Sequence, residues 1–266
     1  MNEAASVRWV SGDLYEPYVG RWSRLVAREF LNWLDAPARL DWLDLGCGTG
    51  VVLEAIAGRC APAHLAGVDS SAGFLDFARL RLKDTGAELH RADARGLPFA
   101  AARFDRVVSG LMLNFVPDQP LAAAEMARVA QPGGEVALYV WDYAEGMEMM
   151  RRFWDAAAAL DPQAAERDEA RRSPICRPEP LRRLFEGAGL TEVETRAIDV
   201  PTAFRDFDDY WVPFLGGQAP APAYCMSLTE EGRTALRERL RASLPAQADG
   251  SIRLVARAWA VRGRKA

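Results

Sequence analysis

The segment Leu43–Gly50 constrains the fold most, because an apolar strand pattern runs directly into a turn with glycine at every second position. Gly46, Gly48 and Gly50 let the backbone turn tightly and let a ligand approach the main chain, where a Cβ atom would collide. A dinucleotide-binding G-x-G-x-x-G pattern would need glycine at position 51, which is Val51 here. The segment therefore predicts a strand, turn and helix that bind a ligand. An NAD(P)-dependent oxidoreductase is the weaker alternative.

The pattern around that turn predicts a parallel α/β sheet. Short apolar runs alternate with amphipathic ones from residue 39 to 140, which is typical of β-α-β units. The expected strands are 41–45, 64–69, 88–92, 104–109, 135–141, 193–200 and 252–261. The expected helices are 50–59, 71–84, 117–129, 147–160, 178–188 and 229–244. The connection 95–103 is too short for a long helix and predicts a loop or a single turn.

A chain of 266 residues can form one α/β domain with an insertion. We expect a single domain, 1–266, with four parts. These are an N-terminal helical cover (1–36), a cofactor-binding core (37–142), a helical insertion (143–189) and C-terminal strands (190–266) with a lid segment (201–245). Met147, Met150, Phe153 and Trp154 form a stripe that predicts a buried helix face. The stretch 164–172 is charged without an apolar face, which predicts a solvated helix or loop.

Composition narrows the function classes. The net charge is -4, and Lys and Arg are scattered, so nucleic acid is not an expected partner. Residues 1–12 lack a signal-like apolar stretch and no run of about 18 apolar residues occurs, so we expect no membrane contact and a cytoplasmic location. The 4 cysteines form no C-x-x-C pair and only 2 histidines are present, which predicts reduced thiols and no metal site.

Acidic residues follow three of the expected strands. Asp44, Asp69 and Asp93 should meet at one edge, because the carboxyl ends of parallel strands lie together. Asp69 follows Gly50 by 19 residues, the span that an acid needs to reach ribose hydroxyls, and Asp93 can accept from an adenine amine. Three carboxylates would repel a pyrophosphate but suit an adenosyl ligand with sulfonium and ammonium charges. The plainer alternative is that each aspartate caps the following helix.

These residues also carry a resemblance to a known family. The chain resembles the class I S-adenosylmethionine-dependent methyltransferases of the ubiquinone/menaquinone-biosynthesis-like, methyltransferase type 11 group. The matching pieces, within about residues 41 to 141, are LDLGCGTG (43–50), GVDSS (67–71), RADARGLPF (91–99), FDRVVSGLMLNFVPD (104–118) and ARVAQPGG (127–134). The resemblance implies a Rossmann-like doubly wound seven-stranded sheet, mostly parallel with an antiparallel last strand, plus a helical covering insertion. It also implies S-adenosyl-L-methionine as cofactor and methyl transfer to a small-molecule acceptor.

The resemblance implies roles for residues that match the family's motifs. It puts the cofactor's methionine end near Gly46 and Gly48, its ribose on Asp69 and its ammonium near 109–111. In similar enzymes an N-terminal segment folds over the cofactor, where Arg21 can pair with the methionine carboxylate. The expected cofactor-binding residues are Asp44, Gly46, Cys47, Gly48, Gly50, Asp69, Ser70, Asp93, Ala94, Ser109, Leu111, Tyr18 and Arg21.

The catalytic residues are less constrained. Methyl transfer from a sulfonium is an in-line displacement in which alignment and desolvation can supply most of the acceleration, so a base is optional. The candidates are Tyr18, Asn114, Asp142 and Tyr143, and many relatives carry histidine where this chain has Asn114. A catalytically silent S-adenosylmethionine-binding protein is the alternative from another class. The aromatic residues Tyr210, Trp211, Phe214 and Tyr224 predict either a lid over the acceptor or a homodimer contact.

Overall fold

The computed structural model describes residues 20–217 and 219–266, and within them the chain divides into two compact units. We call the first the sheet unit; it contains Ser23–Trp141, Ile175–Ile198 and Ala258–Ala266. The second, the helical unit, contains Asp142–Pro174, Asp199–Arg257 and residues 20–22 of the N-terminal segment. Tyr18, a candidate for both cofactor binding and catalysis, lies outside the described residues.

A seven-stranded sheet runs in the order β3-β2-β1-β4-β5-β7-β6. Its strands are β1 Asp41–Leu45, β2 His64–Asp69, β3 Glu88–Arg91, β4 Phe104–Gly110, β5 Ala130–Trp141, β6 Leu190–Phe204 and β7 Ile252–Lys265. The first five pair in parallel and β7 is antiparallel to β5. The strand order reverses between β1 and β4, as in doubly wound folds. The predicted fold class is confirmed.

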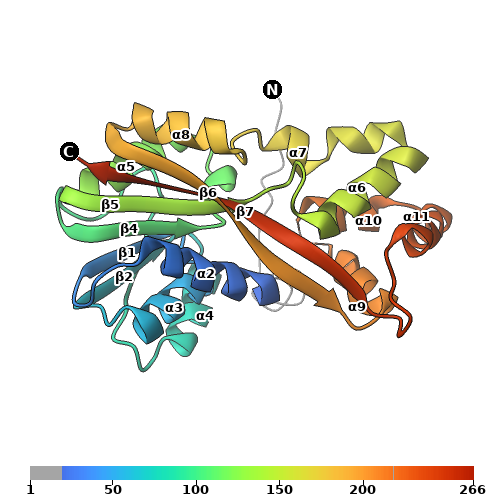
Figure 1. The fold of residues 1–266 in the computed structure, drawn as a ribbon, viewed down its shortest axis with the longest axis horizontal. Helices are drawn as coiled ribbons and strands as arrows, with labels where there is room; N and C mark the ends of the chain where they lie inside the picture. Colours follow the sequence, from blue (N-terminus) through green and yellow to red (C-terminus); the bar gives the residue numbers. More distant parts are fainter. Residues whose placement is uncertain (1–19, 218) are drawn as a thin grey trace. The chain divides into compact units, whose positions relative to one another are not determined.

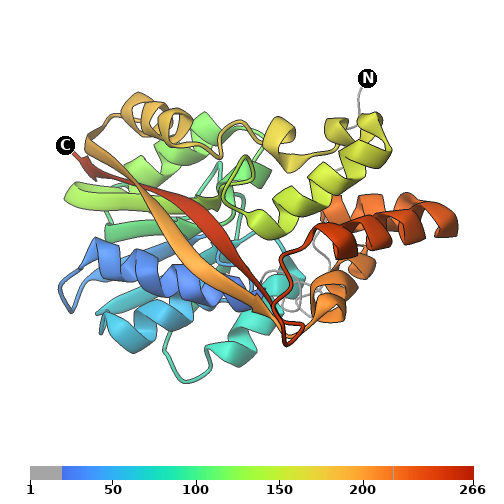
Figure 2. The same ribbon diagram turned by 45° about the vertical axis from the view of Figure 1, so that its right-hand side comes forward.

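Helices cover both faces of this sheet (Figures 1 and 2). On one face lie α2 Arg21–Leu34, α3 Val51–Arg59 and α4 Ala72–Arg81; on the other lie α5 Gln119–Val129 and α8 Pro178–Gly187. Side chains stop the fraying of two of them: Ser71 accepts from Phe74 N at the start of α4, and Asp118 accepts from Leu121 N at the start of α5. The core strands β1 and β4 are buried between the layers.

Four strands are longer than predicted, β4 by a single residue and β5, β6 and β7 by several, because pairing continues past their apolar runs. β5 begins at Ala130 rather than at residue 135, since Ala130 pairs with Phe104 before an irregularity in the register. β6 and β7 both continue into the helical unit, where Arg257 Nε donates to Asp199 Oδ1 at 2.7 Å. Along that end of β6, buried residues alternate with exposed ones up to Phe204.

The helical unit has an aromatic core. Its elements are α6 Glu148–Leu160, η3 Pro162–Glu166, α7 Glu169–Arg172, α9 Phe207–Trp211, η4 Val212–Gly216, α10 Pro220–Ser227 and α11 Glu230–Ser243. Phe153 of α6 stacks on Phe214 of η4 with ring centroids 4.5 Å apart, and Trp154 contacts Tyr224 at 5.5 Å. The stripe on α6 is buried as predicted.

This packing corrects the expectation for the aromatic residues of the lid segment. Tyr210, Trp211, Phe214 and Tyr224 are all buried, and Tyr210 donates its hydroxyl to Met149 O at 2.8 Å. Their rings pack in the core of the helical unit, where apolar burial stabilises the fold, rather than lying exposed as a lid surface.

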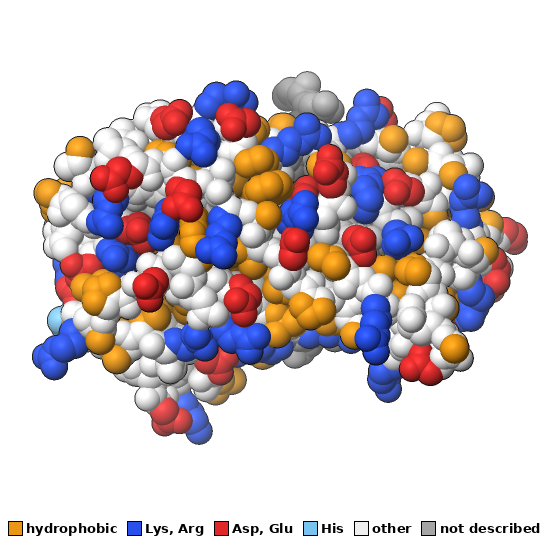
Figure 3. All heavy atoms as spheres, in the orientation of Figure 1, with side chains coloured by type: hydrophobic (Ala, Val, Ile, Leu, Met, Phe, Trp, Pro, Cys, Tyr) orange, Lys and Arg blue, Asp and Glu red, His pale blue; other side chains and the backbone are white. Residues whose placement is uncertain are grey.

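The surface carries charges of both signs. On the face seen in Figure 3, Lys and Arg side chains are interspersed with Asp and Glu. Many charged side chains of the described residues form ion pairs, for example Arg262 with Glu194. Within residues 20–217 and 219–266, no helix is long and apolar enough to cross a membrane.

Two glycine-to-alanine changes test the packing of the sheet against α3. A Cβ atom on Gly110 of β4 would lie 2.6 Å from Tyr139 Oη and 2.9 Å from Val52 Cγ2, whereas one on Gly58 of α3 meets no atom within 4 Å. We expect Gly110→Ala to lower the free energy of unfolding by about 1–3 kcal/mol and Gly58→Ala to raise it by about 0.5–1 kcal/mol. Urea unfolding followed by circular dichroism measures both, and effects of the same sign would contradict this packing.

Candidate functional site

The glycine turn connects β1 to α3 in a backbone conformation that other residues rarely adopt. Gly46, Gly48 and Gly50 have φ angles of 70°, 52° and 86°. The amides of Gly46 and Cys47 both donate to Val68 O, at 2.7 and 2.9 Å, which ties the turn to the end of β2. The main chain is therefore held open at the carboxyl edge of the sheet.

Asp69, at the end of β2, completes this link. Its Oδ2 accepts from Gly48 N at 2.9 Å and its Oδ1 accepts from Ser71 N at 2.8 Å. Burial raises the pKa of the Asp69 carboxyl, although these backbone N–H groups act in the opposite direction. Each oxygen keeps a lone pair that can accept from a further hydroxyl group. The neighbouring Ser70 is exposed, and its carbonyl accepts from Arg91 Nε at 3.2 Å.

Asp44 of β1 has a different environment. It is 0% exposed, and neither carboxylate oxygen has a hydrogen-bond partner in the described part of the chain. Burial, and secondarily the charge of Asp69, raise the pKa of Asp44 well above its usual value. A buried carboxyl without partners costs free energy, so this position needs an explanation beyond packing.

Asp93 and Ala94 follow β3. The Asp93 carboxylate accepts from Arg95 Nε at 2.8 Å, from Arg95 Nη2 at 2.7 Å and from Arg95 N at 2.9 Å. These hydrogen bonds hold the pKa of Asp93 at about 2. Because Asp93 is exposed and its charge is already paired, an adenine amine would have to share this carboxylate with Arg95.

The end of β4 contributes backbone rather than side-chain groups. Ser109 is buried and donates its hydroxyl to Leu45 O at 2.7 Å, which joins β4 to β1. Leu111 has a φ angle of 59°, and its N–H donates to Tyr139 O at 2.8 Å. A left-handed leucine is uncommon and indicates a strained backbone at this edge. Asn114 lies in the short helix η2 Leu113–Phe115 that follows.

Sequence reasoning missed two features of this edge. The positive φ angle of Leu111 could not be predicted from the sequence, because glycine, not leucine, normally adopts such an angle. Met112 packs under the glycine turn, where a Cβ atom on Gly46 would lie 2.2 Å from Met112 Cγ. The regular spacing of the glycines was the one sequence feature that indicated a close approach of another group to the turn.

Arg21 belongs to the helical unit. Its Nη1 pairs with Asp209 Oδ1 at 3.2 Å, and its guanidinium lies 4.3 Å from the ring centroid of Trp22. Its Nε and Nη2 atoms are buried without a hydrogen-bond partner among the described residues. These two atoms form one edge of the guanidinium, the geometry that binds a carboxylate with two parallel hydrogen bonds.

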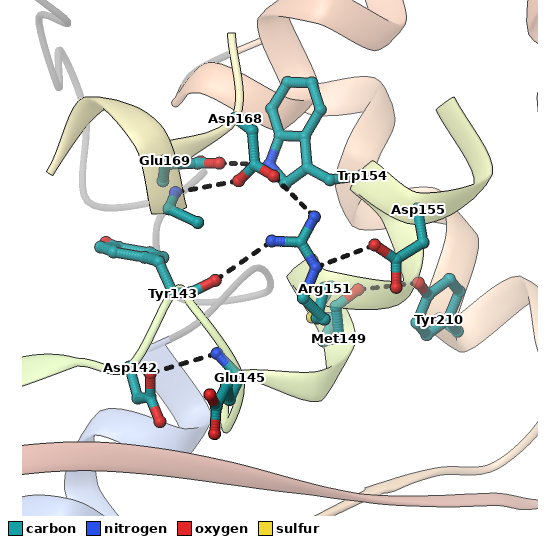
Figure 4. Close-up of polar contacts among 11 residues, drawn as sticks. Asp142, Tyr143, Glu145, Met149, Arg151, Trp154, Asp155, Asp168, Glu169 and Tyr210 are labelled. Carbon is teal, nitrogen blue, oxygen red and sulfur yellow. Dashed lines mark hydrogen bonds and ion pairs between the residues drawn. The ribbon is translucent and has the colours of Figure 1, made fainter. Parts of the chain in front are cut away.

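Asp142 and Tyr143 also belong to the helical unit (Figure 4). Asp142 is 2% exposed, and its two carboxylate oxygens accept from Glu145 N at 3.2 Å and Gly146 N at 3.0 Å. The carbonyl of Tyr143 accepts from Arg151 Nη1 at 3.3 Å. The Asp142 carboxylate therefore stabilises the turn that precedes α6, which is a structural use of a candidate base.

The prediction of a solvated segment at 164–172 is wrong for two acids, because Asp168 and Glu169 are buried, whereas the other charged side chains of the segment are exposed. Asp168 and Glu169 are 7% and 5% exposed. Arg151 Nη2 pairs with Asp168 Oδ2 at 2.6 Å, and the Trp154 indole donates to Glu169 Oε2 (Figure 4). Charges can be buried here because each has a partner on α6, which lies outside the segment and cannot be read from its composition.

Comparisons with known proteins agree with this geometry. Residues 43–138 match a family model described as a methyltransferase domain. A ubiquinone biosynthesis O-methyltransferase of Aromatoleum aromaticum is 38% identical over 112 residues, which are 40% of this chain and 47% of that protein. The match thus spans about half the length of that relative.

Solved structures share the fold over most of the chain. A candidate methyltransferase of Bacillus halodurans has a TM-score of 0.60 at 19% identity, covering 90% of this chain and 98% of its own. Phosphoethanolamine N-methyltransferase 2 of Haemonchus contortus was solved with phosphomonomethylethanolamine and S-adenosylhomocysteine. It has a TM-score of 0.59 at 16% identity, and the match covers 95% of this chain and 56% of that protein. The matched domain, the Aromatoleum aromaticum relative and the shared fold together confirm the resemblance of the motifs to those of class I S-adenosylmethionine-dependent methyltransferases.

The buried Glu169 makes the stability of the helical unit depend on pH. Burial raises the pKa of Glu169 from 4.5 to about 7, so its protonated form favours the folded state. The resulting stabilisation is fully present below about pH 4.5 and is lost as the pH rises through about 7, a change on the order of 3 kcal/mol. Glu169→Gln should therefore flatten this part of the pH profile and be more stable than the wild type at about pH 8.

Urea unfolding at a series of pH values measures this effect. Glu166→Gln is the matched control, because Glu166 is exposed and pairs with Arg171. It should keep the wild-type profile. An unchanged slope in Glu169→Gln would show that Glu169 is not the group responsible.

Proposed function

We propose that the chain transfers a methyl group from S-adenosyl-L-methionine to a small-molecule acceptor. The observation that carries the proposal is the contrast between two carboxyls beside one glycine turn. Asp69 is hydrogen-bonded to the turn and Asp44 is buried without a partner. One relative whose sequence matches this region is a ubiquinone biosynthesis O-methyltransferase, and the mixed charges on the face seen in Figure 3 suit a small molecule better than a phosphate backbone.

The residues present fit this cofactor. The lone pairs of Asp69 suit the two ribose hydroxyls, and a Cβ atom on Gly48 would meet only Gly46 O at 4.0 Å, so a ligand has room against the main chain at Gly48. The partnerless Asp44 suits a cation, because a positive charge relieves the cost of burying a carboxylate. A dinucleotide would bring a pyrophosphate to the same two acids, where like charges repel.

The cofactor supplies an activated methyl group, and the protein's residues bind it and exclude water. We propose that the backbone at Ser109 and Leu111 lies beside the methionine ammonium, with Asp93 and Ala94 beside the adenine. Arg21 belongs to the helical unit, and carboxylate binding through its partnerless Nε–Nη2 edge stays a prediction from the sequence. The Asp142 carboxylate is hydrogen-bonded within the turn before α6, so we do not assign it the role of a base. The main contribution to methyl transfer that we assign to the protein is the alignment of the acceptor with the methyl group. Asn114 of the sheet unit and Tyr143 of the helical unit stay predicted catalytic residues.

Thermal unfolding with S-adenosylmethionine, NADH and NADPH tests the cofactor. A ligand at about 100 times its dissociation constant adds about 2.7 kcal/mol, or roughly 5–10 °C in Tm for a chain of this size. We expect S-adenosylmethionine alone to raise Tm. A shift with NADH or NADPH and none with S-adenosylmethionine would replace the proposal by the oxidoreductase alternative.

Asp69→Ala tests the ribose site. The variant loses the acceptor for ribose hydroxyls, and we expect S-adenosylmethionine affinity to fall by about 100-fold, as measured by titration calorimetry. Asp76→Ala changes an exposed acid of α4 that pairs with Arg79, and this variant should bind like the wild type. Unchanged affinity in Asp69→Ala would remove Asp69 from the site.

Methyl-labelled S-adenosylmethionine, incubated with a panel of phenols, quinols, amines and carboxylates, tests the transfer itself. We expect label in one acceptor class, because displacement at a sulfonium requires mainly an aligned nucleophile. Tight cofactor binding with no labelled product across the panel would favour a catalytically silent binding protein.

A further inference from the structure

We propose that Asp44 holds a proton in the empty protein and releases it when the cationic cofactor binds, so that cofactor loading is coupled to proton release. The inference rests on the proposed function and concerns how the same site handles charge. Its basis is the packing around Asp44, which is unlike that of any other acid at this edge of the sheet.

Asp44 lies in the middle of the sheet. In the strand register it stands between Gly67 of β2 and Val108 of β4. The same face is filled by apolar atoms: a Cβ atom on Gly67 would lie 2.6 Å from Leu53 Cδ1 and 3.1 Å from Cys47 Sγ. Asp44 is therefore enclosed, and both of its oxygens lack partners among the described residues.

Arg81 of α4 donates to Thr49 Oγ1 of the turn at 3.3 Å, but no positive charge acts on Asp44 among the described residues, where the other ionisable groups of the surrounding elements are acidic or neutral. They are Asp69 at the end of β2, the Cys47 thiol in the turn and the Tyr139 phenol, which lies over Gly110 of β4. Burial also raises the pKa of Cys47 well above its usual value, so this thiol is neutral. From α3, Leu53 and Val52 contribute apolar side chains.

The environments of Asp69 and Asp44 favour different protonation states. Asp69 receives N–H groups from Gly48 and Ser71, which stabilise its charged form, whereas Asp44 receives none. Two carboxyls in unlike environments titrate apart, and the one without donors keeps its proton. In the empty protein Asp44 is thus a neutral carboxylic acid beside the charged Asp69.

A cation beside the glycine turn favours the charged form of Asp44 instead of the protonated form. Its charge stabilises the Asp44 carboxylate, the O–H bond breaks, and the proton passes to solvent as the positively charged ligand takes its place. Because binding then releases a proton, affinity rises with pH by up to tenfold per pH unit, and it becomes constant above the pKa of Asp44 in the empty protein. A neutral adenosine ligand gains nothing from this exchange.

Titration calorimetry tests the coupling in two buffers with different ionisation enthalpies, between about pH 5 and 8. For the wild type we expect up to one proton released per S-adenosylmethionine and none per adenosine. Asp44→Asn should release none, with an affinity that no longer depends on pH. Asp76→Asn, an exposed acid paired with Arg79, should release as many protons as the wild type.

Infrared difference spectra keep the test independent of any variant's folding. The empty wild-type protein should show the C=O stretch of a protonated carboxyl that disappears when S-adenosylmethionine is added. S-adenosylmethionine binding without proton release and without that band would overturn this inference and leave the proposed function standing. No S-adenosylmethionine binding by the wild type under any condition would overturn both.

Discussion

The hydrogen bond from Gly48 N to Asp69 Oδ2 joins residues that are 21 positions apart, and the site depends on it. It connects the turn after β1 to the end of β2, while Val68 O holds Gly46 N and Cys47 N from the same side. Parallel strands make this possible, because their carboxyl ends lie at one edge. With the turn held open, Asp44 beneath it remains enclosed and the main chain remains accessible to a ligand.

At the carboxyl edge of the sheet, one acid, Asp69, has hydrogen-bond partners, and the other, Asp44, has none among the described residues. The Asp69 carboxylate accepts hydrogen bonds from backbone N–H groups and so fixes the conformation of the turn. Asp44 has no hydrogen-bond donor among the described residues, and ionising its buried carboxyl therefore costs free energy. Proteins tolerate such a cost where a ligand relieves it. The strained backbone at Leu111 lies at the end of β4, the strand beside β1, so the local rules of packing are relaxed at one edge.

Much of the sheet could be predicted from the sequence, because the signals there are local. The bounds of β1 and β2 agree with the expected strands, since each apolar run ends at a polar residue or at the glycine turn. The pairing of Asp93 with Arg95, the burial of Glu169 against Trp154 and the extra length of β6 depend on contacts outside the pattern of the segment itself. Composition and periodicity carry no information about such partners, so the site's motifs were predictable and its charge balance was not.

The position of β7 sets an order of assembly. It lies between β5 and β6 in the sheet, although its residues follow those of every other strand along the chain. During synthesis β5 therefore presents an unpaired edge, and β6 has no neighbour to join, until the ribosome has released the segment 252–265. Until then the nascent protein must keep the exposed edge of β5 from pairing with other chains, and a chaperone that covers this edge would prevent such pairing.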